Sequence, residues 1–170
     1  MRPGSEEFTD FFVHWEPQVR RYLIWLDGDR SVIDDAAQET MISAFKYWEK
    51  VKVLDQPRAW LFKVAGQRLS DVREARHRAG VSTAPYDFPD TMPPDRRDEF
   101  SVRDDRLTIL EAVRKLPRQQ ATAIALQVQH DLPLNEIADI MSISVGSVKT
   151  HLYHARRTLK ALLAEEGGGL

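Results

Sequence analysis

Cysteine is absent from the 170 residues of the chain. A disulfide, a thiol switch and a cysteine-ligated zinc site are therefore excluded. The sequence has no apolar run near the roughly 20 residues that a membrane helix needs. Its first residues, MRPGSEEFTDFF, lack the basic start and apolar core of a signal peptide. We therefore expect a cytoplasmic protein with no membrane insertion.

Net charge is also small, at −2 near neutral pH, which predicts modest affinity for DNA by the chain alone. The distribution of charge is uneven. Residues 1–56 carry seven Lys or Arg against eleven Asp or Glu, whereas residues 57–80 carry six against two. The acidic part favours a protein partner, and the basic part favours a nucleic-acid backbone.

Strand-like alternation and internal repeats are missing as well. Apolar residues instead recur three and four positions apart, which is typical of helices. The sequence therefore predicts an all-α fold with two small helical domains, over residues 1–78 and 104–166. Residues 79–103 contain four prolines and several acidic residues without helical period, which is typical of a flexible linker.

Within the first domain, the pattern predicts a helix from about Ser31 to Trp48, a loop over residues 49–56 and another helix from Pro57. Within the second domain, Pro117 is expected to open a helix. The apolar stripe of that helix is expected to contain Ala121, Ile124, Ala125 and Val128.

Residues 131–159 are typical of a helix-turn-helix. The first helix places Leu134, Ile137, Ala138 and Met141 on one face. Ser142 and Ile143 make the turn, and Ser144 is a suitable N-cap for the second helix. The inner stripe of the second helix contains Val145, Val148, Leu152, Ala155 and Leu159.

The opposite face of this second helix is polar and basic, and it fits the major groove of duplex DNA. Lys149, Thr150, His151 and His154 are candidates for base edges, and Arg156 and Arg157 for phosphates. Ser147 completes the face. The alternative is a helical hairpin with a solvated charged face. A metal site at the two histidines lacks a third ligand nearby.

Acidic and amide side chains cluster at Asp34, Asp35, Gln38 and Glu39, within two turns of one predicted helix. One interpretation is a solvated surface that benefits from the helix dipole; the other is a docking surface for a protein. General acid–base catalysis is not supported, because no nucleophile or metal ligand accompanies the carboxylates. We therefore do not expect an enzyme, and no cofactor is expected.

The basic helix after Pro57 combines positive charge with aromatic rings. Trp60 and Phe62 can pack or stack. The candidates for phosphate contacts are Arg58, Lys63, Arg68, Arg73, Arg76 and Arg78. Such a mixture suits single-stranded DNA, whose bases are exposed for stacking. Trp60 lies on the apolar stripe, so a plain core position is the alternative for it.

Taken in order, three segments resemble the extracytoplasmic-function (group IV) sigma factors of bacterial RNA polymerase. Asp34–Trp48 is similar to the polymerase-binding helix of sigma region 2, and Pro57–Arg73 to the promoter-melting helix. Leu116–Leu159 is similar to sigma region 4. The resemblance runs from residue 8 to about residue 163. It implies an alternative sigma factor that binds core RNA polymerase, recognises the −35 and −10 promoter elements and promotes DNA melting.

The resemblance also implies roles for single residues. Docking on the clamp coiled coil of the largest polymerase subunit would involve Asp35, Gln38, Glu39 and Thr40. The pocket for a base flipped from the −10 element would be formed by Val51, Lys52, Val53, Leu54, Asp55 and Gln56. Lys63 and Gln67 would lie along the strand that carries this base, and Arg58 and Trp60 are further candidates for −10 contacts. The helix-turn-helix would bind the −35 element as duplex.

Two further expectations follow from the family, and the chain departs from the family pattern at three positions. The linker would enter the RNA exit channel, where Asp87, Asp90 and Asp95 would resemble a polyanion. An anti-sigma factor is an expected partner. The chain departs from the family pattern at His151 and His154, where arginine is more frequent, and at Ser142, where glycine is common.

Two other functions remain as alternatives. A conventional regulator would use the helix-turn-helix on duplex operators, but it would need an effector-binding or dimerisation domain, and none is visible. A small helical enzyme would need a nucleophile, a phosphate loop or a metal-ligand cluster, and the sequence shows none of these.

Overall fold

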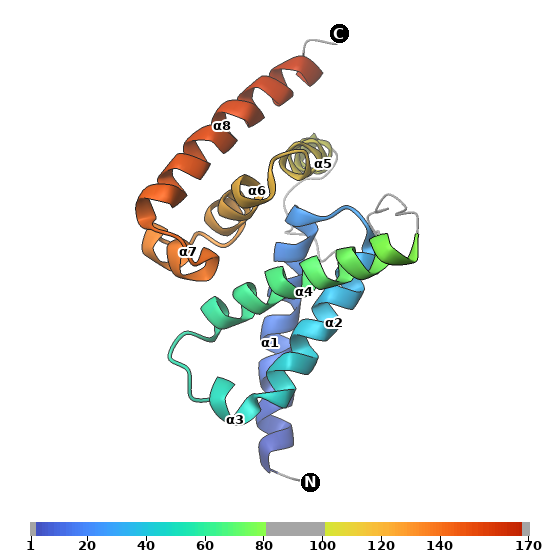
Figure 1. The fold of residues 1–170 in the computed structure, drawn as a ribbon, viewed down its shortest axis with the longest axis vertical. Helices are drawn as coiled ribbons and strands as arrows, with labels where there is room; N and C mark the ends of the chain where they lie inside the picture. The colour runs from blue at the N-terminus through green and yellow to red at the C-terminus, as the bar shows by residue number, and fades with distance from the viewer. Residues whose placement is uncertain (1–2, 81–100, 168–170) are drawn as a thin grey trace.

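The computed structural model describes residues 3–80 and 101–167 of the chain, and every regular element in that part is a helix (Figure 1). The N-terminal block consists of α1 (Pro3–Leu26), α2 (Arg30–Lys46), α3 (Trp48–Val51) and α4 (Pro57–Ala79). The C-terminal block consists of α5 (Ser101–Arg114), α6 (Arg118–Ile124), the π-helix η1 (Ala125–Gln129), α7 (Leu134–Met141) and α8 (Val145–Gly167). The predicted all-α fold is confirmed.

In the N-terminal block, α1, α2 and α4 pack around a shared core of apolar side chains. Local sequence sets the helix ends. The Asp29 carboxylate accepts a hydrogen bond from the backbone N–H of Ser31 at 2.9 Å and caps α2. Pro57 opens α4 in the first turn, and Gly80 ends it with φ of 69°, a conformation that glycine adopts without a Cβ clash.

The helix predicted up to Trp48 ends two residues earlier, at Lys46. Tyr47 leaves the helical conformation, with φ of −105° and ψ of 25°, and the short helix α3 follows. Trp48 and Val51 are buried on α3, because the bend at Tyr47 turns both side chains inward. The predicted loop is accordingly shorter and covers residues 52–56.

In the C-terminal block, a π turn changes the expected register. The stripe predicted for the helix after Pro117 included Val128, yet 58% of Val128 is exposed. η1 begins at Ala125, and a π turn holds more residues than an α turn. The side chains after it are therefore rotated, Val128 faces solvent and Leu126 is fully buried.

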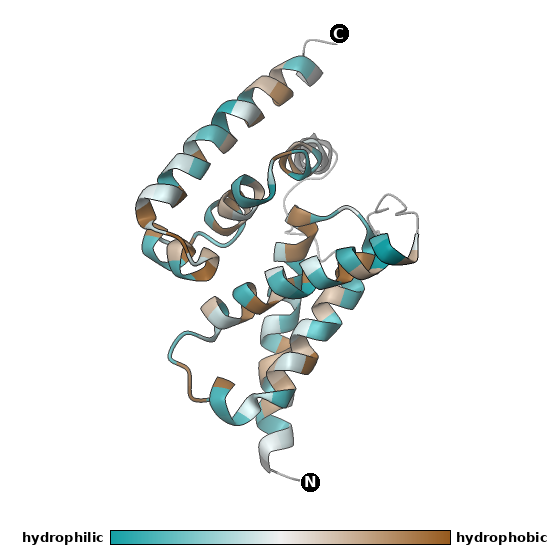
Figure 2. Ribbon diagram, viewed as in Figure 1, coloured by the Kyte–Doolittle hydropathy of each residue, from teal (hydrophilic) through white to brown (hydrophobic). Residues whose placement is uncertain are grey.

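The two blocks lie against each other (Figure 1), and one apolar cluster continues from one block to the other. Figure 2 shows hydrophilic residues over much of the outer helix faces. At the junction, the guanidinium of Arg114 on α5 donates to the carbonyl oxygen of Ile24 on α1 at 2.6 and 3.0 Å. None of the helices over residues 3–80 and 101–167 is long and apolar enough to cross a membrane.

Candidate nucleic-acid interface

The helix-turn-helix is formed by α7 and α8, and its turn has the predicted chemistry. Ser142 adopts the left-handed conformation, with φ of 56° and ψ of 41°. The hydroxyl of Ser144 accepts a hydrogen bond from the backbone N–H of Ser147 at 3.1 Å, as an N-cap does. Of the predicted inner stripe of α8, Val148, Leu152 and Ala155 are buried, Leu159 is half-buried and Val145 is 37% exposed. This packing fixes which face of α8 points outward.

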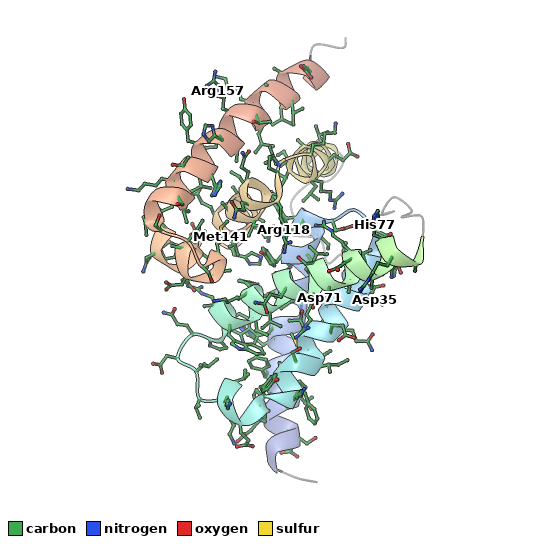
Figure 3. The ribbon with its side chains drawn as sticks, viewed as in Figure 1. Asp35, Asp71, His77, Arg118, Met141 and Arg157 are labelled. Carbon is green, nitrogen blue, oxygen red and sulfur yellow. The ribbon has the colours of Figure 1, made fainter. Side chains whose placement is uncertain are left out.

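The outward face of α8 carries most of the polar residues predicted to meet DNA. Lys149, Thr150, His154, Arg156 and Arg157 are exposed, and Ser147 and His151 are half-buried. Figure 3 shows Arg157 pointing away from the rest of the molecule. A helix face with this composition can enter a major groove and combine base-edge with phosphate contacts.

Two details of this face escaped the sequence reasoning. Tyr153 is 61% exposed and its ring contacts that of His154, with centroids 5.4 Å apart. The guanidinium of Arg156 donates to the side-chain oxygen of Gln127 on η1. Arg156 is therefore held against its own domain, while Arg157 extends outward. No sequence signal distinguished these two neighbouring arginines.

Most arginines of α4 have carboxylate partners. Arg58 pairs with Glu136, Arg68 with Asp71, Arg73 with Asp27 and Arg76 with Asp35, over N–O distances of 2.5 to 3.0 Å. Hydrogen bonding to Glu136 raises the pKa of Arg58. Lys63 differs, because it is exposed and makes no ion pair within the part of the chain that the structure describes.

Lys63 and Gln67 open into a crevice of about 430 Å³ between the two blocks. Cationic side chains on its walls are Lys63, Arg73, Arg114 and Arg118, and no carboxylate lines it among the described residues. Figure 3 shows Arg118 and Met141 on the side of the C-terminal block that faces α4. The crevice thus joins the predicted strand-binding residues of α4 to the second domain.

The loop before α4 is exposed from Lys52 to Gln56. Two of its side chains are apolar and open to solvent, Val53 at 72% and Leu54 at 40%. Val51 lies differently from the expectation, because it is 1% exposed on α3 and supports the loop from inside. Trp60 is half-buried and packs against the core with part of its side chain.

The acidic face of α2 is exposed at Asp35, Gln38 and Glu39. Thr40 does not belong to this face. Its side chain is fully buried and its hydroxyl donates to the carbonyl oxygen of Ala36 at 2.7 Å. Thr40 faces the core because the position one residue after Glu39 is turned about 100° around the helix.

Sequence reasoning also missed two apolar residues beside this acidic face. Ile42 is 51% exposed and Phe45 is 62% exposed. They continue the row of Asp35 and Gln38 at spacings of four and three residues, so all four share one side of α2. The spacing could be read from the sequence, but nothing in the sequence indicated that Ile42 and Phe45 lie outside the core.

Comparison with known proteins identifies the family. Residues 11–79 match the family model of Sigma-70 region 2, and residues 106–159 match that of Sigma-70 region 4. The ECF RNA polymerase sigma factor SigL of Mycobacterium tuberculosis is 34% identical over 150 residues, which cover 86% of this chain and 83% of SigL. The chain belongs to the family of ECF RNA polymerase sigma factors.

Other sigma factors are similar at lower identity. BldN of Streptomyces coelicolor is 27% identical, over 95% of this chain and 62% of BldN. Among solved structures, the sigma factor RpoE of Bartonella quintana, in complex with the anti-sigma factor NepR, matches with a TM-score of 0.75 at 21% identity. The match covers 94% of this chain and 98% of RpoE. This last similarity concerns the fold.

As a sigma factor, the protein acts in transcription initiation. It binds core RNA polymerase and promoter DNA, with region 2 serving −10 recognition and melting and region 4 serving −35 recognition. The N-terminal block contains region 2, and the helix-turn-helix belongs to region 4. Residues 81–100, which include Asp87, Asp90 and Asp95, lie outside the described residues.

Proposed function

We propose that this sigma factor binds polymerase, the −10 strand and the −35 duplex through three separate surfaces. The exposed face of α2 binds core polymerase, the loop over residues 52–56 together with α4 holds the −10 strand, and the outer face of α8 reads the −35 duplex. Residues 1–78 and 104–166 act as the two modules, and residues 79–103 connect them. The protein works in the cytoplasm, beside its polymerase, and carries no catalytic activity of its own.

The α2 surface combines charge with apolar area. Asp35, Gln38 and Glu39 present carboxylates and an amide, and Ile42 and Phe45 add exposed apolar surface on the same side. Interfaces take most of their affinity from such apolar and aromatic side chains, while charges fix orientation. We assign the clamp coiled coil of the largest polymerase subunit as the partner of this row. Thr40 supports the helix from the core and makes no contact.

The −10 surface offers a place for an unpaired base. Val53 and Leu54 are exposed apolar side chains at the tip of the loop, with Lys52, Asp55 and Gln56 beside them. Extruding a base from a duplex costs a few kcal/mol, and apolar contact with polar edges around it offsets that cost. Lys63 and Gln67 then follow the strand along α4, and Arg58 and Trp60 flank the entry.

The −35 surface is the outer face of α8. Lys149, Thr150 and His154 are placed for base edges, and Arg157 for phosphate. Ser147 and His151 border this face and contribute less, because both are half-buried. Arg156 acts from the rim, held by Gln127. The exposed Tyr153 adds an aromatic contact that can pack on a thymine methyl group or a sugar.

An anti-sigma factor is the proposed regulatory partner. The solved structures of RpoE and CnrH contain the anti-sigma factor NepR and the cytosolic domain of CnrY, respectively. Membership of the same family supports a partner of this kind for the present chain. Affinity capture of the tagged chain from resting cells should yield such a protein; capture of polymerase alone, in resting and induced cells alike, would argue against it.

The observation that carries the proposal is the exposed row on α2, which an ordinary duplex-binding regulator does not need. Run-off transcription with purified core polymerase on a promoter library tests it and returns both promoter elements. We expect Glu39→Arg to abolish core binding and transcription, and Thr40→Ala to leave core binding unchanged. Glu165→Arg, with the same charge change at an exposed position of α8, serves as control. Normal core binding by folded Glu39→Arg would refute the docking surface.

A further inference from the structure

One row of α4 faces the C-terminal block and contacts it at each turn. The Arg58 guanidinium donates to both carboxylate oxygens of Glu136 at 2.5 and 2.7 Å. The Phe62 ring lies against His130, with centroids 4.5 Å apart. The Gly66 carbonyl oxygen accepts from Arg118 at 3.0 Å. Residues 58, 62 and 66 are four apart, so one straight side of α4 forms the junction.

The ion pair between Arg58 and Glu136 is the strongest polar element of this junction. Glu136 is only 5% exposed, and its carboxylate is bidentate on the guanidinium, a geometry that strengthens such pairs. A buried carboxylate left without its partner is strongly unfavourable. Separation of the blocks therefore requires that Glu136 leave its site on α4 and become hydrated.

Further contacts lie on the α1 side of the junction. The indole N–H of Trp25 donates to the side-chain oxygen of Gln129 at 2.9 Å, and Arg114 donates to the Ile24 carbonyl oxygen. Tyr22 also contacts His130, with ring centroids 6.1 Å apart. Contacts from α5, α6, η1 and α7 thus reach the N-terminal block together, which makes the arrangement of the two blocks specific.

This junction lies on the −10 surface proposed above. Arg58 is held by Glu136, and Lys63 and Gln67 stand on the wall of the crevice whose opposite wall includes Arg118 and Met141. A DNA strand that follows α4 must pass through the space where α6 and α7 contact it. The outer face of α8 is different, because Arg157 points away from the junction (Figure 3).

We propose that this sigma factor holds itself closed: through the latch of Arg58 and Glu136, the C-terminal block sits against α4 beside the exposed Lys63 and Gln67 and blocks the path of a DNA strand along the helix, while the −35 face stays open. The proposal rests on the proposed function of α4. It predicts that the free chain can bind duplex DNA through α8 but binds single-stranded DNA only after the latch opens. Binding to polymerase and a melted strand then requires the two blocks to separate.

The first experiment measures closure in the free, full-length chain. Because the chain has no cysteine, Glu74→Cys and Lys160→Cys, both at exposed positions, can be labelled for energy transfer between α4 and α8. We expect Glu136→Gln to raise the ratio of open to closed molecules about tenfold or more. Asp139→Asn, an exposed residue of the same helix, should leave the ratio unchanged.

The second experiment measures binding of two DNA probes, oligo(dT) and a random-sequence duplex. Glu136→Gln should bind oligo(dT) about tenfold or more tightly than the parent chain, with unchanged affinity for the duplex. Arg118→Ala removes the contact with the Gly66 carbonyl oxygen from an exposed position and should act in the same direction, more weakly. It keeps the test valid if Glu136→Gln lowers the stability of the fold.

The outcomes separate this proposal from the proposed function. Core binding and transcription by the parent chain, with equal energy transfer and equal oligo(dT) affinity in all variants, would overturn the latch and leave the function intact. Failure of the parent chain to bind core polymerase would instead overturn the function. An equal gain in affinity for both DNA probes would also overturn the latch, since closure then would not act on the −10 face selectively.

Discussion

The imidazole of His130 packs against the ring of Phe62 in the junction, with the ring centroids 4.5 Å apart and the ring planes inclined by 46°. Burial is the main cause that lowers the pKa of His130, to about 4 from 6.5, and the nearby charges of Arg21 and Arg58 lower it further. The Nε2 atom is buried without a hydrogen-bond partner among the described residues. The neutral ring is therefore the form that fits the closed chain.

Acidification should open the chain. A neutral His130 stabilises the closed form fully above pH 6.5, and this contribution is lost as the pH falls toward about 4. The difference corresponds to about 3 kcal/mol between the two protonation states. Tyr22, Arg21 and Arg58 surround the ring, and Glu136 offsets the charge of Arg58. Energy transfer between labelled α4 and α8, measured from pH 7 to pH 5, should fall.

The matched variant for this pH dependence is His130→Gln, which cannot acquire a proton in that range. Its energy transfer should stay constant between pH 7 and pH 5, while His77→Gln, at an exposed position of α4, should behave like the parent chain. A parental pH profile in His130→Gln would show that another group controls opening.

Ser142→Gly should stabilise the C-terminal block. Ser142 holds φ of 56° in the turn of the helix-turn-helix, a conformation that costs an ordinary residue about 1 kcal/mol and costs glycine almost nothing. The free energy of unfolding from urea titration should rise by about 1 kcal/mol, less the greater entropy of the unfolded glycine chain. Ser142→Val should lower it, because a branched Cβ worsens the clash. A gain in stability for the valine variant would contradict this account of the turn.

Arg157 and Arg156 should affect DNA binding differently. Arg157→Ala removes an outward cation, so duplex affinity should fall for all sequences and the slope of log affinity against log salt should decrease by about 1. Arg156→Ala removes a side chain that is bonded to Gln127, and its effect on the salt slope should be smaller. Fluorescence anisotropy with a labelled duplex at several salt concentrations measures both. Equal salt slopes for the two variants would place both arginines on the phosphates.

Features encoded within a few residues were predictable from the sequence. The cap at Ser144, the start of α4 at Pro57 and the inner stripe of Val148, Leu152 and Ala155 depend on neighbours three or four positions away. Local spacing therefore predicted the helix-turn-helix and its outer face, because α8 has one apolar stripe and the opposite side must face solvent.

Features that depend on distant residues were not predictable. Glu136 was one acidic residue among many, and its partner Arg58 is 78 positions away. The family resemblance implied a docking role for Thr40, yet the packing of α2 places its side chain inside. Val128 fits the α-helical stripe in the sequence, and only the π turn, which the sequence does not mark, moves it to the surface.

The π turn of η1 also connects the DNA-reading helix α8 to the contacts that hold the two blocks together. Gln127, Gln129 and His130 follow its start and contact, respectively, Arg156 on α8, Trp25 on α1 and Phe62 on α4. Regular α-helical winding of the same residues would turn the side chains that follow the start of η1 by about 100° and break these contacts. These few residues therefore tie the DNA-reading helix to two helices of the N-terminal block at once, so a change in their winding would loosen both attachments together.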